Sequence, residues 1–321
     1  MKRIISVFMV IIMLTMLLSG CEFLNSDITE RRVNFYVDGE LYDSKTAIAG
    51  SPVSMPQNPQ KDNMIFLGWY TVLDTEYDFS SAIIFDLDLY AKFTLDAVKL
   101  TNFITQNSMK SVVTVHNHSY NTGILGMETE YVESLGSGVV IDVSGGWCYV
   151  LTNSHVAAKE EGYASNKLTV EDACGRQYTA NLYKNTGIGV SAISEKYDLA
   201  VLCFRYTEDY LTEIGVASDP LVGDYVVSIG SPDGQQNAIT YGTVQMYSKV
   251  KAQDGDSIAN IQFDIIVHDS PIDHGSSGGP ILNTKGQLVG LNFAGYNDGL
   301  LGCAIPMSKI HEFLNTYVYG R

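Results

Sequence analysis

Short apolar runs of strand length recur along the last two thirds of the chain, and turns rich in glycine, aspartate and asparagine separate them. Short strands at regular spacing are typical of β-sandwiches and β-barrels, whereas alternating strands and helices would indicate a parallel α/β sheet. We therefore expect an all-β architecture over residues 110–321. The runs that indicate it are Ser111–Val115, Gly138–Asp142, Cys148–Leu151, Leu168–Val170, Ala200–Phe204, Tyr225–Ile229, Thr243–Met246, Asn260–Ile266 and Leu288–Phe293.

The last segment is the helical exception in this pattern. Its apolar residues follow helical spacing, at Ile310, Phe313, Leu314 and Tyr317. This spacing places one apolar face along a helix. Ser308 can cap the start of such a helix, and Gly320 can end it. The sequence therefore predicts a C-terminal helix within residues 306–320.

Residues 33–94 are expected to form a separate small β domain. Residues 33–37 alternate between apolar and polar side chains, and the Asp-Gly pair that follows is a hairpin signal. Trp69 has two interpretations, a ligand platform with its neighbour Tyr70 or the core of a small sheet. We favour the core, because small domains rely on aromatic side chains for buried area. Residues 95–109 then link this domain to the rest, and the apolar residues of this segment suggest that it packs on one neighbour: Val98, Leu100, Phe103 and Ile104.

A stretch rich in glycine and serine, Asp273-His274-Gly275-Ser276-Ser277-Gly278-Gly279-Pro280, is the strongest chemical signal in the sequence. A serine nucleophile needs a tight turn that lifts its oxygen clear of the backbone. It also needs bare backbone N–H groups where negative charge develops. The glycines permit both, because they tolerate unusual backbone angles and carry no Cβ. Taken alone, the stretch is also compatible with a glycine-rich hairpin between two strands.

Two upstream segments supply partners for a serine nucleophile. Thr152-Asn153-Ser154-His155-Val156 ends one strand-like run, and Tyr197-Asp198-Leu199-Ala200-Val201-Leu202 begins another. The order His155, Asp198, Ser277 is that of chymotrypsin-type enzymes. Over about residues 110–318 the chain resembles a trypsin-like serine protease, in particular the bacterial HtrA (Deg) type. The remaining matching words are Gly136-Ser137-Gly138-Val139-Val140, Val222-Gly223-Asp224, Ile229-Gly230-Ser231-Pro232, Ser276-Ser277-Gly278-Gly279-Pro280 and Ala304-Ile305-Pro306.

This resemblance implies two six-stranded β-barrels with an active site between them, and a serine endopeptidase that acts on polypeptides. Ser277 would be the nucleophile and His155 its general base. Asp198 would accept the other ring N–H of His155 and so fix its tautomer. The backbone N–H groups of Gly275 and Ser277 would form the oxyanion hole.

By the same resemblance, six residues line the primary specificity pocket: Pro271, Ile272, Phe293, Ala294, Gly295 and Gly302. No acid stands at Pro271, where trypsins carry one, so cleavage is expected after small or medium aliphatic residues. The alternative is that Asp269 or Asp273 enters the pocket and selects a basic residue, although burying an unpaired carboxylate is costly. Asp273 and Ser276 also replace asparagines that are usual in HtrA proteins, which bears on site geometry and regulation but not on the triad.

Residues 1–20 have the pattern of an export signal. Lys2 and Arg3 precede an apolar run that is short for a membrane-spanning helix. The run ends in Leu18-Ser19-Gly20-Cys21, which is similar to a bacterial lipobox. That resemblance implies acylation of Cys21 with a diacylglyceryl group and anchoring in the lipid bilayer on the extracytoplasmic face of the cell membrane. Residues 21–32 would be a polar tether. An ordinary cleaved signal with an incidental cysteine is the alternative.

The segment 33–94 resembles the Listeria–Bacteroides (internalin B-type) repeat, a β-grasp-like module of surface proteins. A cell-surface or cell-wall partner is therefore a candidate ligand of this domain. The sequence stops after the expected C-terminal helix, so the PDZ domain that often follows in HtrA proteins is expected to be absent. The matching words of the repeat are Gly50, Pro56, Pro59, Phe66-Leu67-Gly68-Trp69-Tyr70, Tyr77-Asp78-Phe79 and Leu89-Tyr90-Ala91-Lys92-Phe93.

The net charge and the spacing of potential metal ligands argue against nucleic-acid binding and against a metal site. The formal net charge of −16 argues against a nucleic-acid partner. No cofactor or metal site is expected, because His116 and His118 form a pair without an evident third ligand. Cys148 and Cys203 lie in apolar runs and are expected to be buried free thiols. The sequence leaves the pairing of the cysteines open, at Cys148, Cys174, Cys203 and Cys303.

Two hypotheses of different class remain. The first is a membrane-anchored extracytoplasmic serine endopeptidase. The second is a catalytically inactive protease-fold surface protein, in which the repeat-like domain acts as a binding or adhesion module. The sequence favours the first, because all three triad residues stand in the segments that carry the resemblance.

Overall fold

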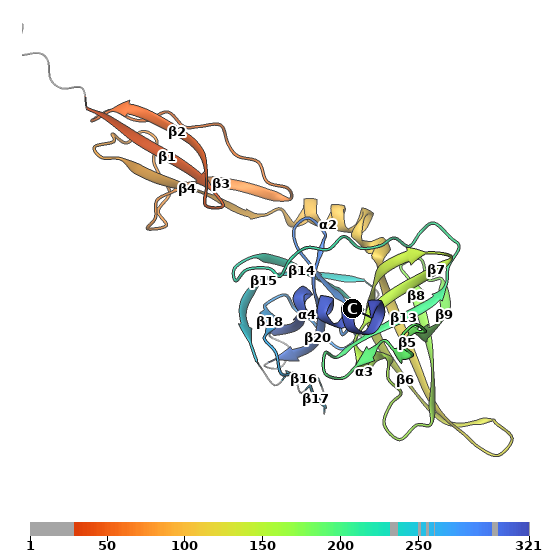
Figure 1. Ribbon diagram of the computed structural model, residues 1–321. Coiled ribbons are helices and arrows are strands. Elements are labelled where there is room, and N and C mark those ends of the chain that lie inside the picture. The colour runs from red at the N-terminus through yellow and green to blue at the C-terminus, as the bar shows by residue number, and fades with distance from the viewer. Residues whose placement is uncertain are drawn as a thin grey trace, which may run out of the picture. The chain divides into compact units, whose positions relative to one another are not determined.

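The computed structural model describes residues 29–231, 237–249, 252–254, 257–259, 261–296 and 301–320. The chain folds as two units, Met1–Thr94 and Leu95–Arg321. Figure 1 shows the described strands and helices of both. Over the described ranges, no helix combines the length and apolar character needed to cross a bilayer. The expected signal segment, Cys21 and most of the expected tether lie outside the described residues.

A four-stranded sheet forms the first unit, in the spatial order β2-β1-β4-β3. Asp38 and Gly39 have positive φ values of 51° and 83°, as a two-residue hairpin turn between β1 and β2 requires. Trp69 is only 1% exposed, and its ring meets that of Phe35 edge-on at 4.9 Å. Trp69 is therefore a core residue. The strands are β1 (Glu30–Val37), β2 (Glu40–Ile48), β3 (Met64–Tyr70) and β4 (Leu87–Leu95).

The first barrel of the second unit is a closed ring of six strands. Its strands are β5 (Val112–Thr122), β6 (Glu128–Ser144), β7 (Trp147–Thr152), β8 (Ser165–Asp172), β9 (Gln177–Leu182) and β13 (Leu199–Arg205). The ring closes because β13 pairs with β7 on one side and with β9 on the other. Inside it, apolar side chains that include Val115, Val150 and Leu202 are completely buried. Short elements of this half are α3 (Ser154–Ala157), β10 (Lys184–Asn185), β11 (Val190–Ser191) and β12 (Ile193–Ser194).

The second barrel also closes with six strands, because β20 pairs with both β19 and β21. Its strands are β14 (Tyr225–Gly230), β15 (Ala238–Ser248), β18 (Ile265–His268), β19 (Pro280–Leu282), β20 (Leu288–Tyr296) and β21 (Leu301–Pro306). A short hairpin of β16 (Ala252–Asp254) and β17 (Ser257–Ala259) extends from β20. The expected fold of two six-stranded barrels with a C-terminal helix is confirmed.

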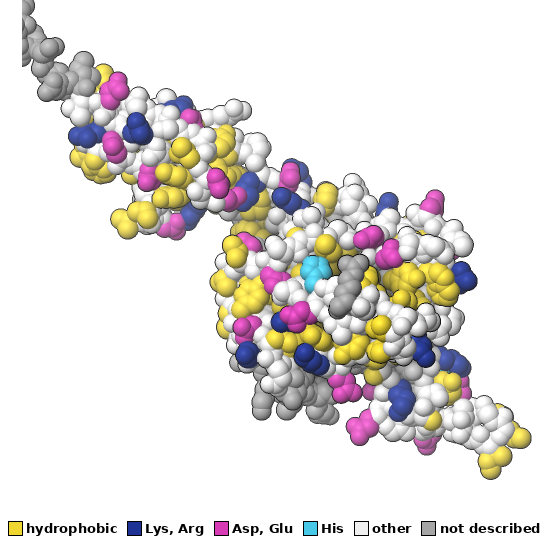
Figure 2. Space-filling view, viewed as in Figure 1, with side chains coloured by type: hydrophobic (Ala, Val, Ile, Leu, Met, Phe, Trp, Pro, Cys, Tyr) yellow, Lys and Arg dark blue, Asp and Glu magenta, His cyan; other side chains and the backbone are white. Residues whose placement is uncertain are grey.

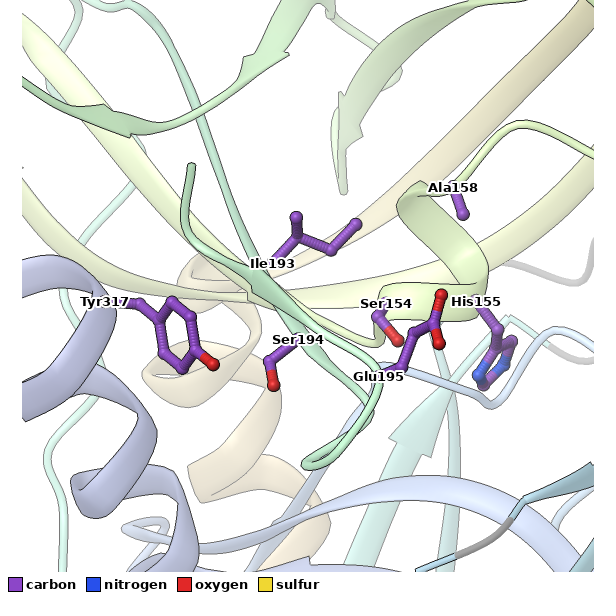
Figure 3. A pocket seen from close by; sticks show the side chains of 7 residues that line it. All are labelled: Ser154, His155, Ala158, Ile193, Ser194, Glu195 and Tyr317. Atoms are coloured by element: carbon purple, nitrogen blue, oxygen red, sulfur yellow. The ribbon is translucent and has the colours of Figure 1, made fainter. Parts of the chain in front are cut away.

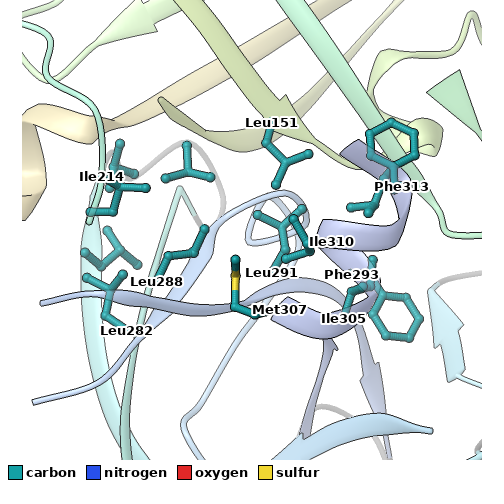
Figure 4. Packing of buried hydrophobic residues seen from close by; sticks show 14 of the residues in the cluster. Leu151, Ile214, Leu282, Leu288, Leu291, Phe293, Ile305, Met307, Ile310 and Phe313 are labelled. Carbon is teal, nitrogen blue, oxygen red and sulfur yellow. The ribbon is translucent and has the colours of Figure 1, made fainter. Parts of the chain in front are cut away.

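One apolar cluster is shared by both barrels and the helices. Leu151 comes from the first barrel, Leu291 and Phe293 from the second, and Ile310 and Phe313 from the C-terminal helix (Figure 4). All five are less than 2% exposed or completely buried. Because packed interiors resist displacement, this cluster holds the facing edges of the two barrels in a fixed relation.

The helices of the second unit are α2 (Ala97–Gln106), the 3₁₀ turn η1 (Ser108–Ser111), α4 (Met307–Leu314) and the π-helical turn η3 (Asn315–Tyr319). The segment 95–109, expected to be a linker, packs into this unit: Leu100 and Ile104 of α2 are completely buried in the shared cluster. Ser308 does not cap α4 with its side chain. The helix begins one residue earlier, and the Asp219 carboxylate accepts the Ser308 N–H at 2.9 Å.

Surface charge and cysteine chemistry complete the description. Figure 2 shows acidic and basic side chains interspersed over both units on the face drawn. Cys148, Cys174, Cys203 and Cys303 are free thiols. Burial raises the pKa of Cys148 and of Cys303 to about 12, so neither thiol ionises near neutral pH. Cys203, expected to be buried, is partly exposed.

Candidate active site

His155 is presented by a short helical turn at the end of β7. Its neighbours Val156 and Ala157 are buried in the first barrel. Asn117 of β5 donates from Nδ2 to the carbonyl oxygens of Val156 and Ala158, at 2.9 and 2.5 Å. The turn is therefore anchored directly after His155, whose side chain is 39% exposed.

Asp198 is brought to His155 by a tight turn before β13. The residue has a φ of 51°, a left-handed conformation that aspartate tolerates better than most residues. Its carboxylate is 9% exposed and accepts the His155 ring N–H from Nδ1, at 2.8 Å to Oδ2 and 3.0 Å to Oδ1. Oδ1 also accepts the Ser154 hydroxyl at 2.8 Å and the His155 backbone N–H at 3.1 Å. These bonds satisfy the buried carboxylate and leave Nε2 of His155 as the basic nitrogen.

Ser277 stands in the second of two consecutive tight turns. The Ser276 N–H donates to the Asp273 carbonyl and the Gly279 N–H to the Ser276 carbonyl, both at 2.9 Å. The third residue of each turn is a glycine with positive φ, 93° at Gly275 and 82° at Gly278. This combination is typical of type II turns. A Cβ on Gly278 would lie 2.1 Å from the Ser137 carbonyl oxygen, so only glycine fits there.

The turn of Ser277 is tied to both barrels. The Ser137 N–H of β6 donates to the Ser277 carbonyl at 2.7 Å. The Gly278 N–H donates to the Asn292 carbonyl of β20 at 2.8 Å. A Cβ built on Gly136 would meet Val156 at 2.6 Å and the Ser277 carbonyl oxygen at 3.1 Å, so the α3 turn and the Ser277 turn flank the same glycine. The structure thus places the three sequence-predicted triad residues at one barrel junction.

The Ser277 hydroxyl itself donates to the Phe293 carbonyl, at 3.3 Å. Transfer of its proton to His155 therefore requires rotation of the serine side chain to another staggered position. The backbone N–H groups of Gly275 and Ser277 have no acceptor among the described residues. The Gly275 carbonyl accepts the Ser137 hydroxyl at 2.8 Å. Two free, neighbouring N–H groups of this kind suit a developing oxyanion.

The residues predicted to line the specificity pocket come from two places. Phe293, Ala294 and Gly295 lie on β20, and Gly302 on the paired strand β21, where Gly295 faces Gly302. Pro271 and Ile272 lie in the loop between β18 and the Ser277 turn. Both acids of the alternative interpretation have local partners. Asp269 accepts the Thr243 N–H at 2.6 Å and the Gln245 side chain at 2.9 Å, and Asp273 accepts the His274 N–H at 2.7 Å.

His268 and Asn292 are site residues that sequence reasoning missed. Both are completely buried, and they share a hydrogen bond of 3.0 Å between Nε2 and Oδ1. The backbone of Asn292 accepts the Gly278 N–H and donates to the Gly279 carbonyl, each at 2.8 Å. A Cβ on Gly302 would lie 2.2 Å from the His268 ring. The pair thus supports both the Ser277 turn and the predicted pocket; its only sequence signal was a histidine ending an apolar run.

Burial lowers the pKa of His268 to about 4, although its bond to Asn292 opposes the shift. Because the pKa is lower in the folded than in the unfolded protein, the unfolded state binds more protons between about pH 6.5 and 4. The free energy of unfolding should therefore fall as the pH falls through this window, by on the order of 3 kcal/mol from this residue.

Urea unfolding of wild type and His268→Gln between pH 4 and 7 measures this contribution. The variant lacks the ring, so the stability advantage of wild type over it should shrink on acidification. A stability difference that stays constant across that range would contradict the assignment.

Two protein families and several curated proteins are similar to this chain. Residues 136–291 match the family described as the trypsin-like peptidase domain, and residues 32–92 match the Listeria-Bacteroides repeat domain. Serine protease HTRA4 of Mus musculus is 33% identical over 189 residues, which cover 59% of this chain and 35% of that protein. The putative serine protease HhoA of Synechocystis sp. is 32% identical over 188 residues, with 58% and 43% covered. The chain thus spans less than half the length of either relative.

Solved structures show the same fold. The HtrA-type protease AlgW with a tripeptide superimposes with a TM-score of 0.51 at 24% identity, covering 69% of this chain and 64% of that one. The Rv3671c protease from M. tuberculosis in its active form gives 0.52 at 22% identity, covering 70% and 87%. The second unit therefore has the trypsin-like fold, and its sequence is similar to the trypsin-like peptidase domain and to HtrA-type serine proteases, while residues 32–92 are similar to the Listeria-Bacteroides repeat domain.

Proposed function

We propose that this chain is a serine endopeptidase that hydrolyses peptide bonds through His155, Asp198 and Ser277. One observation carries the proposal. The first barrel holds an imidazole bound through Nδ1 to a buried carboxylate, and the turn of Ser277 is fastened to that barrel through the 2.7 Å bond from Ser137. The similarity to named serine proteases supports it.

The geometry supports a two-step acyl transfer. Nε2 of His155 would take the Ser277 proton as Oγ attacks the peptide carbonyl carbon. The N–H groups of Gly275 and Ser277 would hold the oxyanion of the tetrahedral intermediate. The imidazolium, stabilised by Asp198, would then protonate the leaving amine. Water would repeat the sequence and release the acid.

The predicted specificity pocket supports cleavage after small or medium aliphatic residues. Phe293 and Ala294 are apolar and buried. Asp269, the acid that could have selected a basic side chain, is held by donors on β15. We expect valine, alanine or leucine before the cleaved bond. A peptide library with all residues at that position tests this preference.

We further propose that the chain is an extracytoplasmic lipoprotein held at the cell membrane by acylated Cys21. The export pattern and the Leu-Ser-Gly-Cys ending of residues 18–21 support this. Cys21→Ala should move the protein from the membrane fraction to the soluble fraction, because it removes the thiol that carries the lipid. Detergent-phase partitioning of both proteins is the measurement. Equal partitioning into detergent would contradict the anchor.

A fluorophosphonate probe tests the endopeptidase proposal against the inactive binding module. Covalent labelling of the folded full-length chain, lost after heat denaturation, is expected for an activated serine. Absence of labelling, together with absence of cleavage of an unfolded protein substrate, would favour the binding module.

A further inference from the structure

A pocket of about 600 Å³ lies beside His155, apart from the predicted specificity pocket. Its lining includes His155 and Ala158 around α3, Ile193 and Glu195 at the start of the Asp198 turn, and Tyr317 of η3. Figure 3 shows the Glu195 carboxylate close to Ser154 and His155, with the Tyr317 ring on the other side of the segment 193–195. Three segments far apart in the chain therefore form one hollow next to the general base.

Glu195 gives this pocket an uncompensated negative charge. Glu195 is exposed, and within the described ranges its carboxylate takes part in no ion pair and no side-chain hydrogen bond. The neighbouring Lys196 is engaged elsewhere: its ammonium donates to the Tyr197 hydroxyl at 3.2 Å and lies 4.7 Å from the centre of that ring. A cation from outside the molecule is the natural partner for this carboxylate.

The walls of the pocket are held in place by the fold. Ile193 pairs with Ala200 in the β12–β13 ladder, and the Glu195 carbonyl accepts the Asp198 N–H at 3.2 Å. Tyr317 stacks on Phe313 at 5.1 Å between ring centres. It belongs to a π-helical turn, an element that is often found at functional sites. The pocket is thus a built site and not the outcome of one mobile side chain.

We propose that this pocket binds a lysine or arginine side chain of the polypeptide substrate, within two residues of the cleaved bond. The proposal rests on the proposed endopeptidase function. His155 contacts the reacting serine hydroxyl in that mechanism and lines this pocket, and an extended peptide advances only about 3.3 Å per residue. The aliphatic stem of a basic residue would pack on Ile193 and Ala158. Its charge would meet the Glu195 carboxylate.

The test is a set of fluorogenic peptides with valine before the cleaved bond. In each peptide one position is varied, chosen from the two residues before and the two residues after the cleaved bond, without changing the valine. This position carries lysine, arginine, glutamine or glutamate. For wild type we expect kcat/KM about fivefold higher with lysine or arginine than with glutamine at one of these positions. The preference should weaken at high salt, because salt screens the pairing of partly exposed charges.

Three variants of the full-length chain locate the effect. Glu195→Gln should abolish the preference, and Glu195→Lys should reverse it in favour of glutamate. Glu161→Gln is the matched control: it makes the same change of charge at an exposed glutamate after α3 that does not line the pocket. It should retain the full preference for the basic side chain.

The outcomes separate this inference from the endopeptidase proposal. Cleavage that is equal for lysine, glutamine and glutamate at every position would overturn the pocket assignment alone. So would a preference for lysine that survives Glu195→Gln. If wild type neither cleaves nor labels, the endopeptidase proposal is overturned, and peptide binding to Ser277→Ala by calorimetry then decides for the pocket. The pocket assignment is supported if the lysine peptide binds more tightly than the glutamine peptide and Glu195→Gln removes this difference. It is overturned if the two peptides bind equally.

Discussion

Ser277→Ala is expected to lower kcat for peptide hydrolysis by about 10⁶-fold, because it removes the oxygen that we propose forms the acyl intermediate. The fold should be unaffected. The bonds that hold the turn, from Ser137 N–H to the Ser277 carbonyl and from Gly278 N–H to the Asn292 carbonyl, use backbone atoms and remain. Steady-state hydrolysis of an unfolded protein substrate, with circular dichroism of both proteins, measures the two expectations together.

Ser276→Ala is the matched control for this experiment. It removes a hydroxyl from the adjacent residue, whose oxygen accepts the Asp273 N–H at 3.2 Å. Loss of one such hydrogen bond should cost about 1 kcal/mol. The expected fall in kcat is therefore far smaller than for Ser277→Ala. If the Ser277→Ala protein kept even a hundredth of the wild-type kcat, Ser277 would not be the nucleophile.

Asp198→Asn is expected to lower kcat by about 10⁴-fold near neutral pH. The present carboxylate accepts the His155 ring N–H at 2.8 Å and so leaves Nε2 unprotonated. In the asparagine variant, an amide N–H group at the position of Oδ2 would donate a hydrogen bond to Nδ1 of His155. Nδ1 would therefore have to be unprotonated. His155 would then carry its proton on Nε2 and could not take one from Ser277. A kcat profile over pH 5 to 9 for both proteins measures the loss and its pH dependence.

Ser154→Ala is the control for this prediction. It removes one hydrogen-bond donor to Asp198 but keeps the bond that orients the His155 imidazole. Its hydroxyl also bonds Asp198, at 2.8 Å to Oδ1, but the variant leaves the carboxylate and its bond to Nδ1 in place. We expect its kcat to fall by no more than about tenfold. An Asp198→Asn protein with kcat in the same range as Ser154→Ala would exclude a tautomer-fixing role for Asp198.

Local sequence predicted those parts of the fold that depend on a few adjacent residues. Alternation over residues 33–37 and the Asp-Gly pair indicated a hairpin, and both turn residues have the positive φ that this turn requires. The short apolar runs of residues 110–321 indicated strands, and two closed barrels contain them. Strand and turn preferences act over four to eight residues, so a single sequence carries them.

The sequence predicted the ends of helices and the packing partners of segments less well. Ser308 was predicted to cap the C-terminal helix, but its N–H is bound by Asp219 from a distant loop. The apolar residues of segment 95–109 were predicted to pack on one neighbouring domain, and the structure shows that Leu100 and Ile104 are buried in the second unit. In both cases the deciding contact joins residues far apart in the chain, so local patterns do not identify the partner.

The amino-acid sequence by itself determined which groups are available for chemistry and that Ser277 stands on a turn with glycines on either side, because turn geometry depends on adjacent residues. Only the tertiary structure decided that Ser137 and Asn292 fasten this turn, that His268 supports it, and that Glu195 and Tyr317 share a pocket with His155. These contacts exist because closure of two barrels around one apolar cluster brings distant segments together. The burial that offsets the entropy of closure belongs to the whole unit and to no single stretch.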